Sequence, residues 1–363
     1  MTERNIAVLP GDGIGPEIMD EAVRLLELIG EKYGHRFHFH YADVGGAAWE
    51  KYHSHLPEST LGTCRNADAI LFGSVGGHVN LQHTEKWSGV EVNSLLGLRK
   101  HFGLYANLRP ARLYTALASS SPLRADIAEK GFDILVVREL TGGIYFGEPK
   151  GRSGKGGEEF AFDTMLYKRD EIRRIADLAF RIAGTRKAKV TSIDKANVLK
   201  TMVFWREVVE EVRENYPEID YEPMYVDNAA QQLLLDPSQF DVLLCGNMFG
   251  DILSDEAAAL SGSLGMLPSA SLAEEGFGMY EPGGGSAPDI AGKGIANPIA
   301  QIMSAAMMLK YSFGMPDAYD TVSAAVENVL NRGFRTKDIA GPDTKILSTK
   351  KMGEMIRAEI RDK

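Results

Sequence analysis

The feature that most constrains this chain is a regular alternation of strand-like and helix-like segments along its 363 residues. Short, nearly continuous apolar runs are typical of strands covered on both faces, and they occur at 6–10, 68–73, 132–139, 187–194, 221–227 and 240–246. Patterns of helical periodicity follow many of them, for example at 17–30, 169–184 and 297–312. The alternation predicts an α/β fold, and the length favours two domains.

Composition excludes several classes of protein. The net charge is -10 and no basic run occurs, which argues against a nucleic-acid surface. No apolar run approaches the ~18 residues of a membrane span, and the charged N-terminus does not resemble a signal peptide. Cys64 and Cys245 lie far apart, and Cys245 falls in an apolar run and reads as a core residue. Because no disulfide framework is indicated, we expect a reducing cytoplasm.

Two glycine-rich segments suggest ligand contact. LPGDGIGPE, residues 9–17, follows a strand-like run. Pro16 stands where the dinucleotide motif G-x-G-x-x-G requires its third glycine, so a tight strand-to-helix turn is favoured. The segment 279–298, MYEPGGGSAPDIAGKGIANP, predicts an ordered loop that is neither helix nor strand and whose bare backbone approaches a ligand. Residues 147–159, rich in Gly and charge, predict a surface loop or dimer arm.

Several polar residues near strand ends have both a functional and a structural interpretation. Three arginine forks would suit a dicarboxylate if they converged, and each alone would form an ion pair or lie on the surface: Arg99, Arg109 and Arg138. Lys195 is either a general base or half of a salt bridge.

The acidic and histidine pairs are similarly ambiguous. Asp251 and Asp255 are four residues apart, hence on one helical face, where they would bind a hard cation or complement a helix dipole. Asp227, at the end of a strand-like run, has the same two interpretations. His38 and His40 share a strand face, for which a solvated surface is favoured over a metal site.

Six motifs in this order resemble the isocitrate/isopropylmalate family of β-decarboxylating dehydrogenases: GDGIGPE, LRKHFGLYANLRPA, VVRELTGGIYFG, DKANVLK, GNMFGDILSDEAA and EPGGGSAPDIAGKGIANP. The resemblance implies a two-domain, non-Rossmann α/β fold with a sheet running through a central cleft. Residues 1–104 plus 262–363 would bind the cofactor. Residues 105–261 would bind substrate and metal and would form a homodimer with active sites shared between subunits.

The resemblance also implies residue roles. Arg99, Arg109 and Arg138 would grip the substrate carboxylates, and Asp227, Asp251 and Asp255 would bind Mg²⁺ or Mn²⁺. Asp227, which would also contact substrate, and Lys195, the base, would come from the partner subunit, and Tyr145 would protonate the enol. Leu95, Leu96 and Val198 would line the wall for the third-carbon substituent. NAD would contact His78, Glu91, Gly285, Ser286, Ala287, Pro288, Asp289, Ile290 and Asn297, and the Asp289 carboxylate would favour NAD over NADP.

The implied reaction is NAD-dependent oxidative decarboxylation of (2R,3S)-3-isopropylmalate to 4-methyl-2-oxopentanoate and CO₂ in leucine biosynthesis. One alternative is a relative acting on D-malate, tartrate, homoisocitrate or isocitrate. Another is a catalytically silent nucleotide- or metal-binding protein, against which Lys195, Tyr145 and the three aspartates argue. The chain departs from many relatives at Gly284, where they have His, and residues 91–94 follow only one branch of the family.

Overall fold

The computed structural model describes residues 2–361 and divides into two compact units. Unit 1 comprises Met1–Leu104, Ala116–Ser121 and Ser261–Lys363, and unit 2 comprises Tyr105–Thr115 and Pro122–Leu260. The segment Ala116–Ser121, which the sequence division placed with the second part, packs with unit 1, where Arg335 Nη2 donates to Ala116 O at 2.6 Å.

Unit 1 is built on a five-strand segment of sheet in the order β2-β1-β3-β12-β11. The first four strands are parallel, and β11 and β12 form an antiparallel hairpin. The strands are β1 (Thr2–Gly11), β2 (His35–Tyr41), β3 (Ala69–Ser74), β11 (Pro268–Leu272) and β12 (Gly278–Pro282). The helices are α1 (Gly15–Tyr33), α2 (Gly46–Tyr52), α3 (Glu58–Arg65), α4 (Gly97–His101), α10 (Ile299–Tyr311), α11 (Pro316–Asn331) and α12 (Thr349–Arg361), with a small ladder of β13 (Phe334–Arg335) and β14 (Lys345–Ile346).

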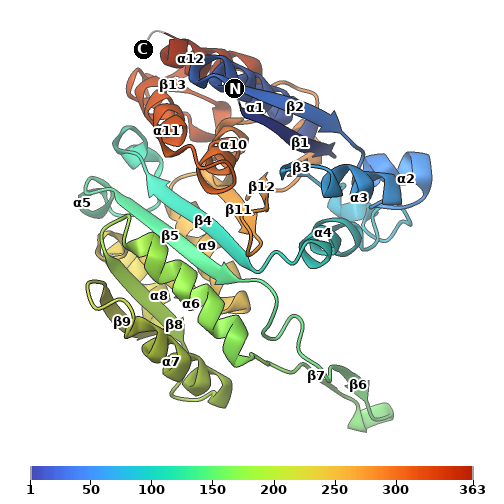
Figure 1. The fold of residues 1–363 in the computed structure, drawn as a ribbon, viewed down its shortest axis with the longest axis vertical. Coiled ribbons are helices and arrows are strands. Elements are labelled where there is room, and N and C mark those ends of the chain that lie inside the picture. Colours follow the sequence, from blue (N-terminus) through green and yellow to red (C-terminus); the bar gives the residue numbers. More distant parts are fainter. Residues whose placement is uncertain (1, 362–363) are drawn as a thin grey trace. The chain divides into compact units, whose positions relative to one another are not determined.

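Unit 2 has the strand order β4-β5-β10-β8-β9, antiparallel between β4 and β5 and parallel elsewhere. Within this unit α6 and α7 cover one face of the sheet and α8 and α9 the other (Figure 1). The strands are β4 (Ala106–Leu113), β5 (Phe132–Glu139), β8 (Lys189–Asp194), β9 (Asp220–Tyr225) and β10 (Val242–Cys245). The helices are α5 (Ala125–Ala128), α6 (Arg169–Ala183), α7 (Lys200–Arg213), α8 (Val226–Leu235) and α9 (Asn247–Leu260).

The predicted α/β fold is confirmed, and each predicted strand run contains an observed strand. Neither unit has the strand order 3-2-1-4-5-6 of the Rossmann fold. One expectation was wrong: residues 279–282 belong to β12, because β11 pairs with their backbone and satisfies its hydrogen bonds, with Met279 opposite Ser271. Asp227 lies in the first turn of α8, two residues after β9 ends at Tyr225.

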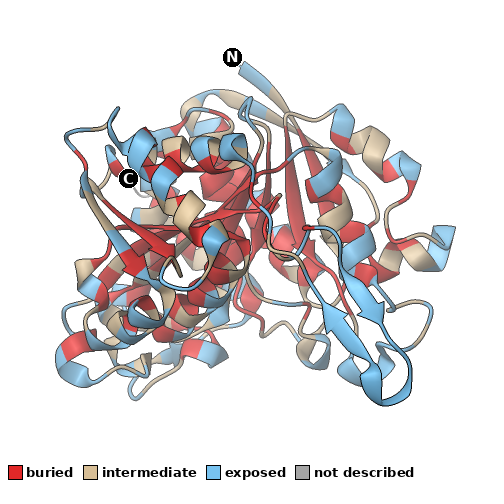
Figure 2. Ribbon diagram, turned by 90° about the horizontal axis from the view of Figure 1, so that it is seen from below, coloured by how far each residue is buried: buried red, intermediate tan, exposed pale blue. Residues whose placement is uncertain are grey.

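The interior strands follow the predicted burial pattern and are largely buried (Figure 2), whereas most residues of the edge strands β2 and β9 are not buried. Cys245 and Cys64 are free and fully buried, and burial raises the pKa of the Cys64 thiol to about 12. His38 and His40 lie on an accessible strand face, where their Nε2 atoms bond to Glu3 at 3.2 Å and Asn5 at 3.0 Å. None of the helices within residues 2–361 is both long and apolar enough to cross a membrane.

The segment predicted to be a surface loop or dimer arm, residues 147–159, is exposed except for the buried Gly147. Its strand β6 (Gly151–Ser153) pairs antiparallel with β7 (Phe160–Phe162), which directly follows the segment, and Gly151 faces Phe162. Phe160 and Phe162 are both exposed, and their rings lie 6.1 Å apart.

A buried ion pair joins two helices of unit 1. Arg357 on α12 donates through Nη1 to Glu21 Oε2 on α1 at 2.6 Å, and both side chains are at least nine-tenths buried. A Cβ at Gly353 would lie 2.0 Å from the same Glu21 oxygen, so the glycine provides the space that the pair occupies. Removing one partner would leave the other charge buried without compensation.

We therefore expect Glu21→Ala to lower the free energy of unfolding of unit 1 by about 3–5 kcal/mol. Glu27→Ala, at an exposed position on the same helix, is the control and should change it by no more than about 0.5 kcal/mol. Urea unfolding followed by circular dichroism measures both. If Glu21→Ala changed the free energy of unfolding as little as Glu27→Ala, Arg357 would have found another partner.

Candidate active site

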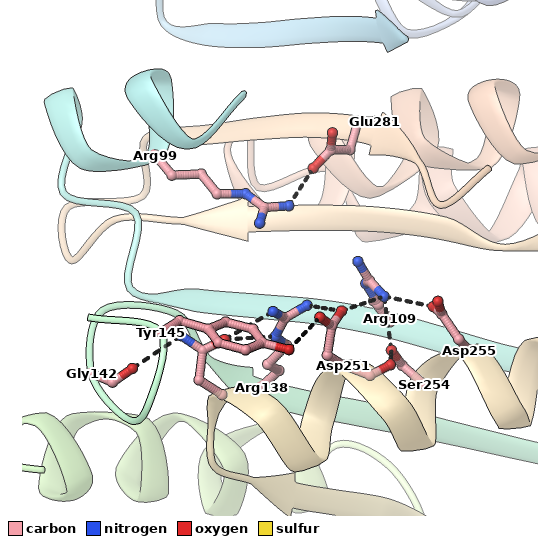
Figure 3. Close-up of polar contacts among 10 residues, drawn as sticks. Arg99, Arg109, Arg138, Gly142, Tyr145, Asp251, Ser254, Asp255 and Glu281 are labelled. Carbon is pink, nitrogen blue, oxygen red and sulfur yellow. Dashed lines mark hydrogen bonds and ion pairs between the residues drawn. The ribbon is translucent and has the colours of Figure 1, made fainter. Parts of the chain in front are cut away.

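Asp251 on α9 is the acceptor around which the polar side chains of unit 2 gather (Figure 3). Its Oδ1 accepts a hydrogen bond from Arg138 Nη1, and its Oδ2 accepts one from the Tyr145 hydroxyl at 3.2 Å. Arg109 Nη1 lies 3.6 Å from Asp251 Oδ1 and 2.9 Å from Asp255 Oδ1 one helical turn further on. The structure therefore brings together two of the three predicted arginines, the tyrosine and two of the three aspartates.

Sheet register explains why the two arginines meet. In the antiparallel β4–β5 pair, Asn107 lies opposite Arg138 and Arg109 is two residues further along β4. Residues two apart in a strand face the same side, so Arg109 and Arg138 share the face of the sheet against which α9 packs. Gly250 allows close packing, because a Cβ there would lie 2.7 Å from the Arg138 side chain.

Tyr145 is kept protonated by its surroundings. Burial raises the pKa of its hydroxyl, and the Asp251 charge and hydrogen bond raise it further, whereas Arg138 opposes the shift. Its ring nevertheless remains 42% exposed. An accessible phenol that holds its proton at neutral pH is suited to donate it to a bound molecule.

Lys195 and Asp227 form a separate pair. Lys195 Nζ lies 2.5 Å from Asp227 Oδ1, and this hydrogen bond lowers the pKa of the Asp227 carboxyl. Both residues follow the ends of paired strands, since Asp194 on β8 is opposite Tyr225 on β9. Val198, in the turn after Lys195, is exposed. Among the described residues no group of three or more His, Cys, Asp or Glu is arranged to hold a metal, so Asp227 does not join the two α9 aspartates within one chain.

In unit 1 the two glycine-rich segments contact each other. Ile14 N donates to Ser286 O at 2.8 Å, and a Cβ at Gly13 would lie 2.0 Å from the same oxygen. Glu17 Oε2 also accepts from Gly294 N at 3.0 Å. Ala287 is left-handed, with φ 41°, and introduces a single 3₁₀ turn at Pro288–Ile290. The turn at residues 9–17 thus supports the loop predicted to hold the cofactor.

Among the other predicted cofactor residues, His78 Nε2 lies 2.9 Å from Asp289 Oδ1, which connects the two predicted cofactor segments. Gly285 and Glu91 are exposed. Asn297 is buried, and its amide donates to Asp338 and accepts from Ile299 N at the start of α10. The structure therefore gives Asn297 an architectural task that the sequence did not suggest.

Arg99 and the two predicted substrate leucines lie in or beside α4 of unit 1. Arg99 Nη2 donates to Glu281 Oε1 at 2.8 Å, and its buried Nε has no hydrogen-bond partner among the described residues. Val92–Leu96 forms a π-helical turn directly before α4, and such turns are frequent at functional sites. Leu95 packs partly against the core cluster of unit 1, and Leu96 is half-buried.

Sequence reasoning missed three polar residues that organise these sites. Asn247 holds Arg138, Glu281 holds Arg99, and Asp12 is a buried carboxylate that accepts from the backbone N–H groups of Gly46, Ala47 and Gly76. Burial raises the pKa of Asp12, and these three donors oppose the shift. A signal was available for Asn247 and Asp12, since each is a polar residue at the turn from an apolar strand run into a helix.

These features are those of an α/β enzyme whose site handles a small carboxylate-bearing molecule. The sequence profile of the isocitrate/isopropylmalate dehydrogenase family matches residues 5–356, and the chain belongs to this family. It is 58% identical over 357 residues to 3-isopropylmalate dehydrogenase of Desulfotalea psychrophila, covering 98% of this chain and 100% of that protein. It is also 58% identical over 366 residues to 3-isopropylmalate dehydrogenase of Haemophilus influenzae, covering 99% and 100%.

Solved structures agree with the family assignment. Isocitrate dehydrogenase of Methylococcus capsulatus superposes with a TM-score of 0.84 at 35% identity and covers 99% of both chains. A β-decarboxylating dehydrogenase of Thermococcus kodakarensis superposes with a TM-score of 0.80 at 35% identity, over 99% of this chain and 96% of that one. The fold class predicted from the motifs is thus confirmed.

The cluster around Asp251 makes a titration prediction. In Asp251→Asn the Tyr145 hydroxyl loses the neighbouring negative charge and its carboxylate acceptor, so the tyrosine pKa should fall toward its ordinary value, with the effect of burial remaining. Tyrosine-selective ¹³C NMR titration, assigned with Tyr145→Phe, measures it. Asp255→Asn is the control, since Asp255 bonds to Arg109. A Tyr145 pKa that is unchanged in Asp251→Asn would contradict the assigned cause.

Proposed function

We propose that the chain is an NAD-dependent 3-isopropylmalate dehydrogenase that oxidises and decarboxylates (2R,3S)-3-isopropylmalate to 4-methyl-2-oxopentanoate in leucine biosynthesis. The observation that carries the proposal is the full-length, 58% identity to relatives that bear this name. The gathering of Arg109, Arg138 and Tyr145 around Asp251 supports it, because a substrate with two carboxylates and a leaving CO₂ needs cations and an acid in one place.

The chain's own residues divide the work as follows. Arg109 and Arg138 bind substrate carboxylate, and Arg99 keeps the carboxylate-binding role that the resemblance implies for it. Lys195 of the partner subunit accepts the proton of the substrate hydroxyl as its neutral amine, after its own proton has passed to the paired Asp227 carboxylate or to water. After CO₂ leaves, Tyr145 donates its hydroxyl proton to the enol carbon. This division requires a homodimer in which Lys195, Asp227 and Val198 of each subunit serve the other subunit's site.

The donor set fits a hard divalent cation, because Asp251 and Asp255 offer carboxylate oxygens on successive turns of one helix. Mg²⁺ or Mn²⁺ would be held by these two residues and the partner subunit's Asp227. When bound, it would supply Lewis-acid stabilisation of the negative charge that develops on the substrate.

The loop of unit 1 fits a dinucleotide. Gly285 is exposed and a Cβ there would meet nothing within 4 Å, so a ligand can approach bare backbone. Asp289, 78% exposed, offers its carboxylate to the adenosine ribose hydroxyls, and His78 steadies it. NAD⁺, when bound, would accept the hydride from the second carbon of the substrate.

The proposal is tested by NADH absorbance with purified protein, Mg²⁺ and a substrate panel. Burying three aliphatic carbons at about 0.8 kcal/mol each predicts about 50-fold higher kcat/KM for 3-isopropylmalate than for malate. Isocitrate should be nearly inert, because leucines offer no donor to its extra carboxylate. Leu96→Ala should erode the preference over malate, whereas Leu61→Ala, a core-packing control in the same unit, should not. Equal efficiency with isocitrate would sink the substrate assignment.

Coenzyme choice is a second expectation. The Asp289 carboxylate would repel the 2′-phosphate of NADP, so the ratio of kcat/KM with NAD to that with NADP should be high and should fall in Asp289→Lys. Glu275→Lys, the same charge change at another exposed position of unit 1, should leave the ratio unchanged. A native protein that used both coenzymes equally would remove this role from Asp289.

A further inference from the structure

Asn247 is a fully buried residue whose side-chain oxygen, side-chain nitrogen and backbone N–H all form hydrogen bonds. It is the first residue of α9 and only 1% exposed. Its Oδ1 accepts from Arg138 Nε at 3.1 Å and from Arg138 Nη2 at 2.8 Å, while its Nδ2 donates to Gly142 O at 3.1 Å. Its backbone N–H donates to the Tyr167 hydroxyl at 2.7 Å.

These contacts fix the orientation of the amide. Arginine has only donors, so the amide oxygen must face it, and the amide nitrogen must then face the carbonyl of Gly142. With two donors of Arg138 held by Asn247, its Nη1 is directed at Asp251. The guanidinium is therefore locked from behind by Asn247 and from the other side by Asp251.

The second contact of Asn247 reaches the loop that carries Tyr145. Gly142 lies three residues before Tyr145, and Figure 3 shows both residues on the loop beside Arg138. The loop is tight: Gly143 has φ 80°, and a Cβ there would lie 2.4 Å from the Tyr167 hydroxyl and 3.3 Å from Asn247 Cβ. Glu139 accepts from Gly142 N at 2.7 Å, so the amide and carbonyl of one peptide segment are both anchored.

We propose that Asn247 is a positioning residue that sets the carboxylate-binding Arg138 and the proton donor Tyr145 at a fixed separation across Asp251. It acts through these two side chains and does not touch substrate. The inference rests on the proposed function, which assigns Arg138 to the substrate carboxylate and Tyr145 to enol protonation. It adds that one amide coordinates the binding step with the proton-donation step.

Two substitutions separate the two contacts. Asn247→Asp keeps an oxygen for Arg138 but places a second oxygen against Gly142 O, so the loop tether is lost. We expect KM within about 3-fold of native and kcat lower by about 10-fold or more. Asn247→Leu removes both contacts, so Arg138 keeps Asp251 but loses the amide oxygen that holds its Nε and Nη2, and KM should also rise by about 10-fold or more.

Pre-steady-state kinetics give a readout that a merely structural role would not move. If proton donation by Tyr145 is slowed while hydride transfer is not, Asn247→Asp should show a burst of NADH followed by slow turnover, as Tyr145→Phe should. The control is Asp241→Asn, another acid–amide exchange at a fully buried residue of unit 2, which bonds to Arg186 and Lys187. It should lower stability without a burst and without a split between KM and kcat.

The position of the loop can be measured without turnover. In crystal structures of the native protein and Asn247→Asp, the Arg138 guanidinium should stay in place and Gly142 should shift. A native protein that showed no activity on 3-isopropylmalate would refute the proposed function. The crystallographic positions of Arg138 and Gly142 would then still test the role of Asn247. An active native enzyme whose Asn247→Asp variant behaves like Asp241→Asn, with Gly142 unmoved, would overturn the inference.

Discussion

The charge of Asp251 is the constraint on which the site of unit 2 depends. Two guanidinium groups whose side chains are only 5% and 11% exposed, those of Arg138 and Arg109, share this carboxylate, and without it they would repel each other in a poorly solvated place. The same carboxylate is the proposed ligand of a divalent cation. A dication and a dicarboxylate together add no net charge, so we expect the two to bind this cluster more readily as a pair than either does alone.

The pairing of the backbone strands and the packing of α9 determine where the side chains of that cluster lie. The antiparallel pairing of β4 with β5 puts Arg109 and Arg138 on one face, and Gly250 lets α9 lie directly upon Arg138. Asp251 and Asp255 then follow from helical spacing alone. A one-residue slip between β4 and β5 would turn Arg109 to the opposite face, so the site inherits its geometry from sheet register.

This dependence explains what the sequence could and could not predict. Consecutive apolar residues located the strands, because a strand that is buried on both faces has apolar side chains at successive positions. The four-residue spacing of Asp251 and Asp255 predicted that they share one face of a helix. Local pattern failed at residues 279–282, where pairing with β11 overrides a glycine- and proline-rich composition. It also failed for Asn247 and Glu281, because their partners Arg138 and Arg99 are 109 and 182 residues away in the chain.

The two units hold their predicted binding groups by different physics. In unit 2 ion pairs with Asp251 and Asp255 hold the Arg109 and Arg138 side chains, and the strength of these pairs depends on what charged molecule arrives. In unit 1 the anchor is Asp12, whose carboxylate faces three backbone N–H groups. Because backbone N–H groups stay in place when a ligand arrives, we expect the Asp12 network to stay intact when a ligand contacts the loop at 285–290. Under the proposed function, unit 1 binds and releases a dinucleotide, which such a fixed frame suits. Unit 2 would move protons and charge, which suits ion pairs whose partners can be exchanged.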